Sequence, residues 1–150
     1  MIRITRDHVI YAFSRWDKPA AFAEPGQCVE FETYDCYQGV MLKEGSTFRD
    51  FDRRFGNPAT GPLYIKGAMP GDTLKSEIWK LEVGPVGILD IGGSSGALKE
   101  AFAGREPVIR RLSVKNGRID YYGIDVPAKP MIGVIGVAPF GEPVGTLIPM

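Results

Sequence analysis

The stretch at residues 57–72 constrains the fold of this chain more than any other feature of the sequence. Two clusters of proline and glycine, at 57–62 and 69–72, enclose the short β-prone run 63–68. Because proline fixes φ and glycine readily adopts positive φ, such clusters are typical of tight turns. We therefore predict turn, strand, turn here, which either shapes a site or only turns a corner of a sheet.

The rest of the composition favours β-structure. The chain has 150 residues, with 19 glycines and 12 prolines, and no long amphipathic helical pattern is present. A chain of this length buries roughly 70% of the surface that its unfolded form exposes, so a core without disulfides is feasible. The sequence therefore predicts an all-β fold in a single domain over residues 1–150.

Charge and hydropathy exclude several classes of partner. The 18 Lys and Arg residues balance the 18 Asp and Glu residues, so we expect no nucleic acid and no anionic membrane surface as a partner. The longest apolar run, 131–140, is interrupted and about half the length of a membrane helix. The amino terminus lacks the apolar core of a secretory signal, and Cys28 and Cys36 read as reduced thiols. We predict a cytoplasmic location.

The expected elements follow from alternation and from turn residues. The strongest signal for a hairpin is the turn sequence Lys115, Asn116 and Gly117. Two Pro-Gly pairs, at 25–26 and 70–71, are each followed by a similar strand pattern. Strands are predicted at 3–13, 28–35, 63–68, 73–83, 86–91, 108–114, 118–122, 124–126 and 131–138, and short helices at 47–55, capped by Ser46, and at 97–103.

Several motifs together resemble one known family. They lie, in this order and spacing, at residues 24–26, 31–36, 57–64 with 67–72, and 129–139. The sequence resembles the acetamidase/formamidase family of amide hydrolases over nearly its whole length. The resemblance implies a jelly-roll-like β-sandwich with one or two short helices in loops. It also implies hydrolysis of a short aliphatic amide, such as formamide or acetamide, to carboxylate and ammonia.

The family pattern also implies a part that this sequence lacks. Members are longer, and after the position of Pro149 they carry a Pro-Gly-x-His-Gly-Gly-Asn-x-Asp stretch that is missing here. We therefore expect activity to need a carboxy-terminal segment or a second polypeptide. A truncated, a cleaved and a naturally short chain all stay open. The other expected partners are the small amide substrate and further copies of the chain in a homo-oligomer.

Asp35 is the candidate catalytic residue. It stands at the end of a predicted strand, inside the family's Glu-Thr-x-Asp-Cys motif. Its carboxylate could bind a divalent metal ion, for which zinc is the first candidate, or act as a general base. An equally weighted alternative is a strand-end turn residue that bonds its own backbone. The candidate substrate-binding residues are Asn57, Thr60 and Gly61, in the turn expected to line the cleft, and Gly133, which leaves room for a ligand to approach.

Other chemistry-bearing residues are left out of the predicted site. Glu32 is expected on the opposite side of its strand from Asp35. Cys36 would need a nearby base to act as a nucleophile, and His8, the only histidine, shows no sign of reaching it.

The sequence leaves two alternative functions open. The chain could be a non-catalytic β-sandwich that serves as an interaction or structural module. Alternatively, the Gly-Gly-Ser-Ser-Gly run at 92–96 resembles that of the amidase-signature serine hydrolases. Those proteins are much larger, are α/β proteins and carry a lysine motif that is not found here.

Overall fold

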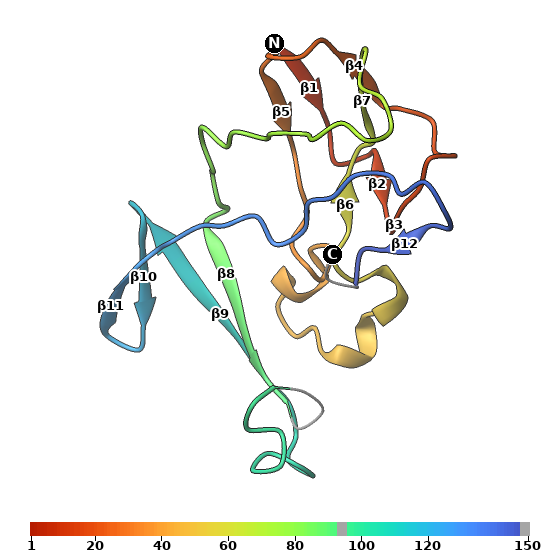
Figure 1. Cartoon of the computed structure of the whole chain (residues 1–150). Coiled ribbons are helices and arrows are strands. Elements are labelled where there is room, and N and C mark those ends of the chain that lie inside the picture. The colour runs from red at the N-terminus through yellow and green to blue at the C-terminus, as the bar shows by residue number, and fades with distance from the viewer. Residues whose placement is uncertain (93–95, 148–150) are drawn as a thin grey trace. The chain divides into compact units, whose positions relative to one another are not determined.

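The computed structural model describes residues 1–92 and 96–147, and its elements are short β-strands and 3₁₀ turns (Figure 1). The all-β class predicted from the sequence is confirmed. The chain divides into two compact units. Unit 1 comprises Met1–Gly39, Asp52–Ile78 and Ile132–Met150, and unit 2 comprises Val40–Phe51 and Trp79–Met131. The single domain over residues 1–150 stays a prediction.

Unit 1 is built from four two-stranded ladders. The parallel pairs are β1 (Ile2–Ile4) with β5 (Val29–Phe31) and β4 (Ala21–Ala23) with β7 (Leu63–Ile65). The antiparallel pairs are β2 (Val9–Ile10) with β6 (Ala59–Thr60) and β3 (Ala12–Phe13) with β12 (Val144–Gly145). The last residues of β1, β3 and β4 are buried, which makes Ile4, Phe13 and Ala23 the core of this unit.

The Pro-Gly turns of unit 1 form as the sequence predicts. The Gln27 N–H donates to the carbonyl oxygen of Glu24 at 3.1 Å, and the Asp72 N–H donates to that of Met69 at 3.0 Å. The glycines of both turns have positive φ, 83° at Gly26 and 98° at position 71. The prediction for residues 57–72 is therefore confirmed in part: β7 and the turn at 69–72 form, whereas the first cluster of proline and glycine contains the short strand β6.

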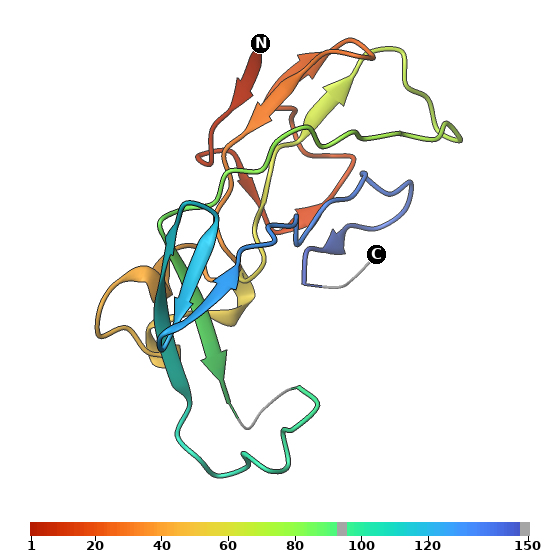
Figure 2. The ribbon, with the colours of Figure 1, turned by 90° about the vertical axis from the view of Figure 1, so that its left-hand side faces the viewer.

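Unit 2 contains a four-stranded antiparallel sheet (Figure 2). Its order is β11 (Ile124–Pro127), β10 (Arg118–Tyr121), β9 (Val108–Lys115) and β8 (Val86–Ile91). The predicted hairpin is confirmed, because Asn116 and Gly117 connect β9 to β10 with φ of 52° and 71°.

The helix predicted at 47–55 is wrong, since two separate 3₁₀ turns lie there, after a first turn, η1 (Val40–Leu42). The second turn, η2 (Phe48–Asp50), is capped by Thr47 and not by Ser46: Thr47 and Asp50 bond each other's backbone in a capping box. Phe51 is extended and ends this turn before η3 (Arg53–Phe55) begins. The segment therefore has two capped starts and no continuous helix.

The helix predicted at 97–103 is also wrong. This run forms consecutive turns with hydrogen bonds three residues apart, as from Ala101 N to Leu98 O at 3.0 Å. It lies between Gly96 and Gly104, which both have positive φ and confine the run to a length at which an isolated helix is unstable. Residues 93–95, which carry most of the Gly-Gly-Ser-Ser-Gly run, lie outside the described residues.

Several predicted strands are wrong in extent or absent. The strand expected at 3–13 is divided into β1, β2 and β3, which pair with three different strands, and those expected at 28–35 and 63–68 shorten to β5 and β7. The stretches 73–83 and 131–138 form no strand. A strand requires a neighbour to accept its hydrogen bonds, and among residues 1–92 and 96–147 these two stretches pair with none. Their apolar side chains are exposed instead, with Trp79 at 76% and Met131 at 80%.

Candidate functional site

Three segments of unit 1 meet at the predicted site. They are the start of β2, the loop after β5, and the turn that contains β6. The Gly61 N–H donates to the carbonyl oxygen of His8 at 2.9 Å, and the Asn57 N–H donates to that of Cys36 at 3.0 Å. The Thr60 hydroxyl donates to the carbonyl oxygen of Glu32 at 2.7 Å. The structure thus brings the 31–36 motif and the 57–61 motif together.

Asp35 holds the turn that follows β5. Its Oδ1 accepts hydrogen bonds from the N–H of Tyr37 at 2.8 Å and of Gly39 at 3.0 Å, and its carbonyl oxygen accepts one from Gln38 at 3.0 Å. The side chain is half-buried. The turn-capping interpretation of Asp35 is therefore present in the structure, and its catalytic and metal-binding roles stay predictions.

Glu32 makes a different set of contacts. Its carboxylate accepts a hydrogen bond from the Arg3 guanidinium, which also lies 3.2 Å from Glu30. The Arg3 hydrogen bond is the main cause that holds the pKa of Glu32 below its usual value, and the Arg6 N–H and both arginine charges add to it, while desolvation opposes it. Glu32 is therefore bound in a surface ion pair.

The turn at 57–61 has a tightly specified backbone. Asn57 adopts φ of 48°, and Gly61 is buried with φ of 147°. A Cβ placed on Gly61 would lie 3.4 Å from the backbone nitrogen of Leu63. Thr60 pairs with Val9 in the β2–β6 ladder and is half-buried. The turn is therefore a fixed element beside Asp35.

Gly133 lies apart from these hydrogen bonds in an exposed stretch. A Cβ built on it would meet no atom within 4 Å. No described atom makes the close approach that this glycine permits, so its role in substrate binding stays a prediction.

The position of His8 was missed from the sequence. Its backbone lies beside Gly61 because β2 pairs with β6, although His8 and Gly61 are distant in the chain. The sequence signal next to His8 is the apolar pair Val9–Ile10, which predicts a strand but does not indicate the strand with which it pairs. Cys28 and Cys36 are both exposed thiols.

The described side chains do not assemble a metal site by themselves. No group of at least three His, Cys, Asp or Glu residues with suitable geometry is found within residues 1–92 and 96–147. Asp35, the predicted ligand, already uses Oδ1 to accept two backbone hydrogen bonds. A zinc or other divalent ion held by Asp35 would therefore need further ligands from outside the described chain.

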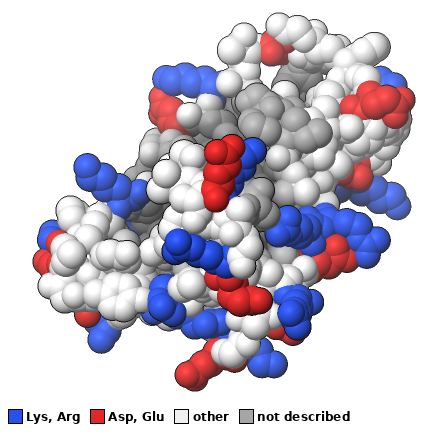
Figure 3. Space-filling view, turned by 90° about the horizontal axis from the view of Figure 1, so that it is seen from below, with Lys and Arg blue, Asp and Glu red and all other residues white. Residues whose placement is uncertain are grey.

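Surface charge agrees with the balanced composition. Lys and Arg side chains alternate with Asp and Glu side chains over the face seen in Figure 3. Several charged side chains of the described residues are paired locally, for example Lys66 with Glu24 at 2.8 Å. In the part of the chain that is described, no helix is long and apolar enough to cross a membrane.

Comparison with known proteins relates the whole site region to one family. The model of the "Acetamidase/Formamidase family" matches residues 5–144. No curated protein matches the chain. Among solved structures, an acetamidase from Bacillus halodurans is 36% identical, with a TM-score of 0.89, and the match covers 96% of this chain and 48% of that one.

Two further structures give the same picture. A predicted acetamidase/formamidase from Thermoanaerobacter tengcongensis is 35% identical, with a TM-score of 0.89, over 96% of this chain and 48% of its own. An acetamidase from Yersinia enterocolitica is 25% identical, with a TM-score of 0.76, over 99% of this chain and 49% of its own. The chain therefore spans about half the length of the structures it matches.

Proposed function

The chain belongs to the acetamidase/formamidase family, and on that basis we propose that it is part of an amide hydrolase. The substrate class is a short aliphatic amide such as formamide or acetamide, and the products are the carboxylate and ammonia. The observation that supports this proposal is the family match over nearly the whole chain, which includes Asp35 and the turn at 57–61.

We assign the following roles in amide hydrolysis to residues of this chain. Amide hydrolysis needs an activated nucleophile, an acid for the departing amine, and donors for the carbonyl oxygen as charge develops on it. Asp35 supplies a carboxylate at the edge of the turn. Asn57 and Thr60 lie in the segment that is hydrogen-bonded to residues 32–36, and the Thr60 hydroxyl already donates to the carbonyl oxygen of Glu32. Asn57 is therefore the donor of choice for the substrate.

The remaining groups come, in this proposal, from a carboxy-terminal segment or from a second polypeptide. The chain spans about half the length of the solved relatives, and within residues 1–92 and 96–147 no group of three or more His, Cys, Asp or Glu residues assembles that could hold a metal ion. We accordingly propose that this chain alone does not turn over amides. The homo-oligomer and the cytoplasmic location expected from the sequence stay predictions.

A non-catalytic interaction module is the second candidate function. The observation that favours it is the exposure of large apolar side chains, among them Trp79 and Met131. A module of this kind would bind a partner without any amide turnover.

Ammonia release distinguishes the two candidates. Formamide and acetamide are offered to the chain alone, and to the chain mixed with the half of the Bacillus halodurans acetamidase that it does not match. We expect ammonia only from the mixture. A mixture that forms a complex but releases no ammonia from either amide contradicts the hydrolase and supports the module. Intact-mass analysis of the purified protein shows in addition whether a second chain accompanies it.

A further inference from the structure

One face of the sheet in unit 2 is almost entirely apolar. The strand register places residues that are directly opposite each other on the same face, as Leu89 with Arg110 and Tyr121 with Ile124. We call this the apolar face. Its members are Gly87, Leu89, Ile91, Val108, Arg110, Leu112, Val114, Ile119, Tyr121, Ile124 and Val126. Arg110 is the one charged residue among them.

The other face of the same sheet, which we call the polar face, carries most of the charged residues of the sheet and is partly covered within unit 2. Arg111 points to this side and donates from Nη2 to the carbonyl oxygens of Lys43 at 2.6 Å and Ser46 at 3.3 Å. Arg118 and Asp125 form an ion pair there at 2.6 Å. The two faces therefore differ, and the loop at 43–46 lies against the polar one.

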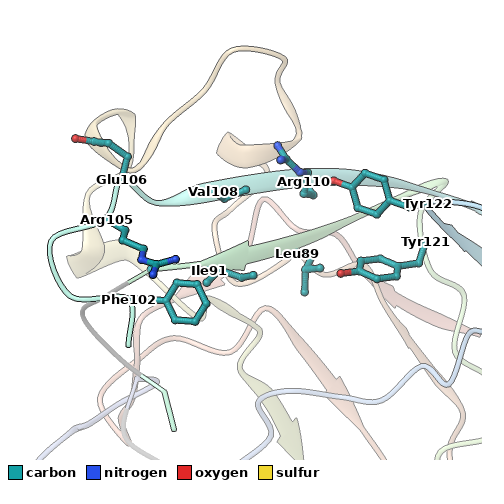
Figure 4. Close-up of a pocket in the computed structure, with 10 residues that line it drawn as sticks. Leu89, Ile91, Phe102, Arg105, Glu106, Val108, Arg110, Tyr121 and Tyr122 are labelled. Atoms are coloured by element: carbon teal, nitrogen blue, oxygen red, sulfur yellow. The ribbon is translucent and has the colours of Figure 1, made fainter. Parts of the chain in front are cut away.

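The apolar face is exposed and hollowed. Leu89 and Tyr121 are each 37% exposed, and Ile124 is 61% exposed. A hollow of about 300 Å³ lies on this face. In Figure 4, Leu89, Ile91 and Tyr121 line it, with Phe102 and Arg105 at one end. Arg105 lies over the Phe102 ring at 5.4 Å, whereas no hydrogen bond from Arg110 to the described residues is present.

An exposed apolar face that extends over four strands is a binding surface in most soluble proteins. Its occupant has to bring apolar side chains, and also a carboxylate, because covering Arg110 without a partner for its charge would cost free energy. The solved relatives are about twice as long as the part that this chain matches. They therefore contain a second half of about equal length, which this chain does not match.

We propose that the apolar face of unit 2 is the docking surface for a polypeptide corresponding to that second half, with an Asp or Glu of this polypeptide opposite Arg110. The proposal rests on the proposed function, since it names where the completing segment binds. It adds the surface and the charge pair, which neither the family nor the relatives' names state.

Binding of the unmatched half of the Bacillus halodurans acetamidase to the full chain tests this proposal. Sedimentation velocity or calorimetry gives the Kd, and circular dichroism checks that each variant is folded. We expect Leu89→Asp and Arg110→Glu each to weaken binding by about tenfold or more. Arg110→Lys keeps the charge and is expected to lose less than Arg110→Glu. Lys115→Glu, on the same strand but the polar face, is the matched control and is expected to bind within about twofold of the wild type.

Each other outcome overturns the docking surface. These outcomes are no binding by the wild-type chain, binding that Leu89→Asp and Arg110→Glu leave unchanged, and self-association of the chain that these variants abolish. A large loss of stability of the isolated Leu89→Asp chain would show that the face is already covered. Because binding and ammonia release are measured separately, a complex that binds as expected but releases no ammonia contradicts the proposed function alone.

Discussion

The backbone N–H of Asn57 donates to the carbonyl oxygen of Cys36 at 3.0 Å, and this bond joins the two motifs on which the site depends. The Thr60 hydroxyl adds a second link, to the carbonyl oxygen of Glu32. Residues 32–36 and 57–61 therefore form one hydrogen-bonded piece, with Asp35 at its edge. Substitutions in either segment test whether this piece is only a corner of the fold or also part of an active site.

Asp35 has a structural role and a proposed catalytic role, and two substitutions separate them. Asp35→Ala removes the acceptor of the Tyr37 and Gly39 N–H groups, so we expect the free energy of unfolding to fall by about 1 kcal/mol or more. Asp35→Asn keeps an oxygen in that position, so its stability should stay near wild type. In the complemented enzyme both variants should lose ammonia release, because the charge is gone. The measurements are urea unfolding of the chain and ammonia release from formamide.

Asp35→Asn is the decisive variant of the pair. If the complemented Asp35→Asn enzyme retains wild-type turnover, the carboxylate has no catalytic role and the turn-capping role accounts for the residue. Loss of turnover in Asp35→Ala alone would point in the same direction, since that variant also disturbs the turn.

Asn57 has a left-handed backbone conformation, and this allows its side chain to be tested without strain. With φ of 48°, alanine at this position costs about 1–2 kcal/mol, whereas glycine adopts the conformation freely. Asn57→Gly should therefore fold as well as the wild type but lack the amide donor. We expect its kcat/KM for formamide in the complemented enzyme to fall by about tenfold or more. A kcat/KM equal to wild type in Asn57→Gly removes the side chain from substrate binding.

Local signals in the sequence predicted local structure well. The β9–β10 hairpin follows from Asn116 and Gly117, which adopt the positive φ that the turn requires. The same holds for the turn at Gly26. The two capped turns at 47–55 were predicted as one helix because the extended Phe51 between them leaves no signal in composition, and the cap was assigned to Ser46, one residue before the observed Thr47.

Pairing between distant segments could not be predicted in this way. The parallel ladders of β1 with β5 and β4 with β7 depend on contacts that no short pattern specifies. For the same reason the position of His8 beside Gly61 was missed, and the run 131–138 was predicted as a buried strand although it is exposed. The nearness of the 31–36 and 57–61 motifs was expected from the family resemblance and not from their pattern.

Gly61 and Gly133 provide a matched pair of substitutions. Alanine at Gly61 has to adopt φ of 147° and places its Cβ 3.4 Å from the Leu63 nitrogen, so we expect a loss of about 1–3 kcal/mol in the free energy of unfolding. Alanine at Gly133 meets open space, so its stability should stay within about 0.5 kcal/mol of the wild type. Urea unfolding compares the two. Equal losses at both positions would contradict the described backbone of the turn.

Activity assays on the same pair ask a second question. If Gly133 admits substrate, as the sequence predicts, Gly133→Ala should raise KM in the complemented enzyme while stability is unchanged. An unchanged KM for both formamide and the larger acetamide would remove Gly133 from the predicted substrate-binding residues.

The ion pair of Arg3 and Glu32 predicts how stability depends on acid. Hydrogen bonding to Arg3 holds the pKa of Glu32 in the folded chain below the value of about 4.3 expected when the chain is unfolded. The stabilisation is therefore present above that unfolded value and is lost as the pH falls through the lower, folded value. Glu32→Gln and Arg3→Gln should both make unfolding less sensitive to pH in this range, measured by urea unfolding between pH 2 and pH 6. Both variants remove the Arg3–Glu32 interaction, and Arg3→Gln also removes the ion pair of Arg3 with Glu30. An acid dependence in both variants that matches the wild type would show that this exposed pair contributes nothing to stability.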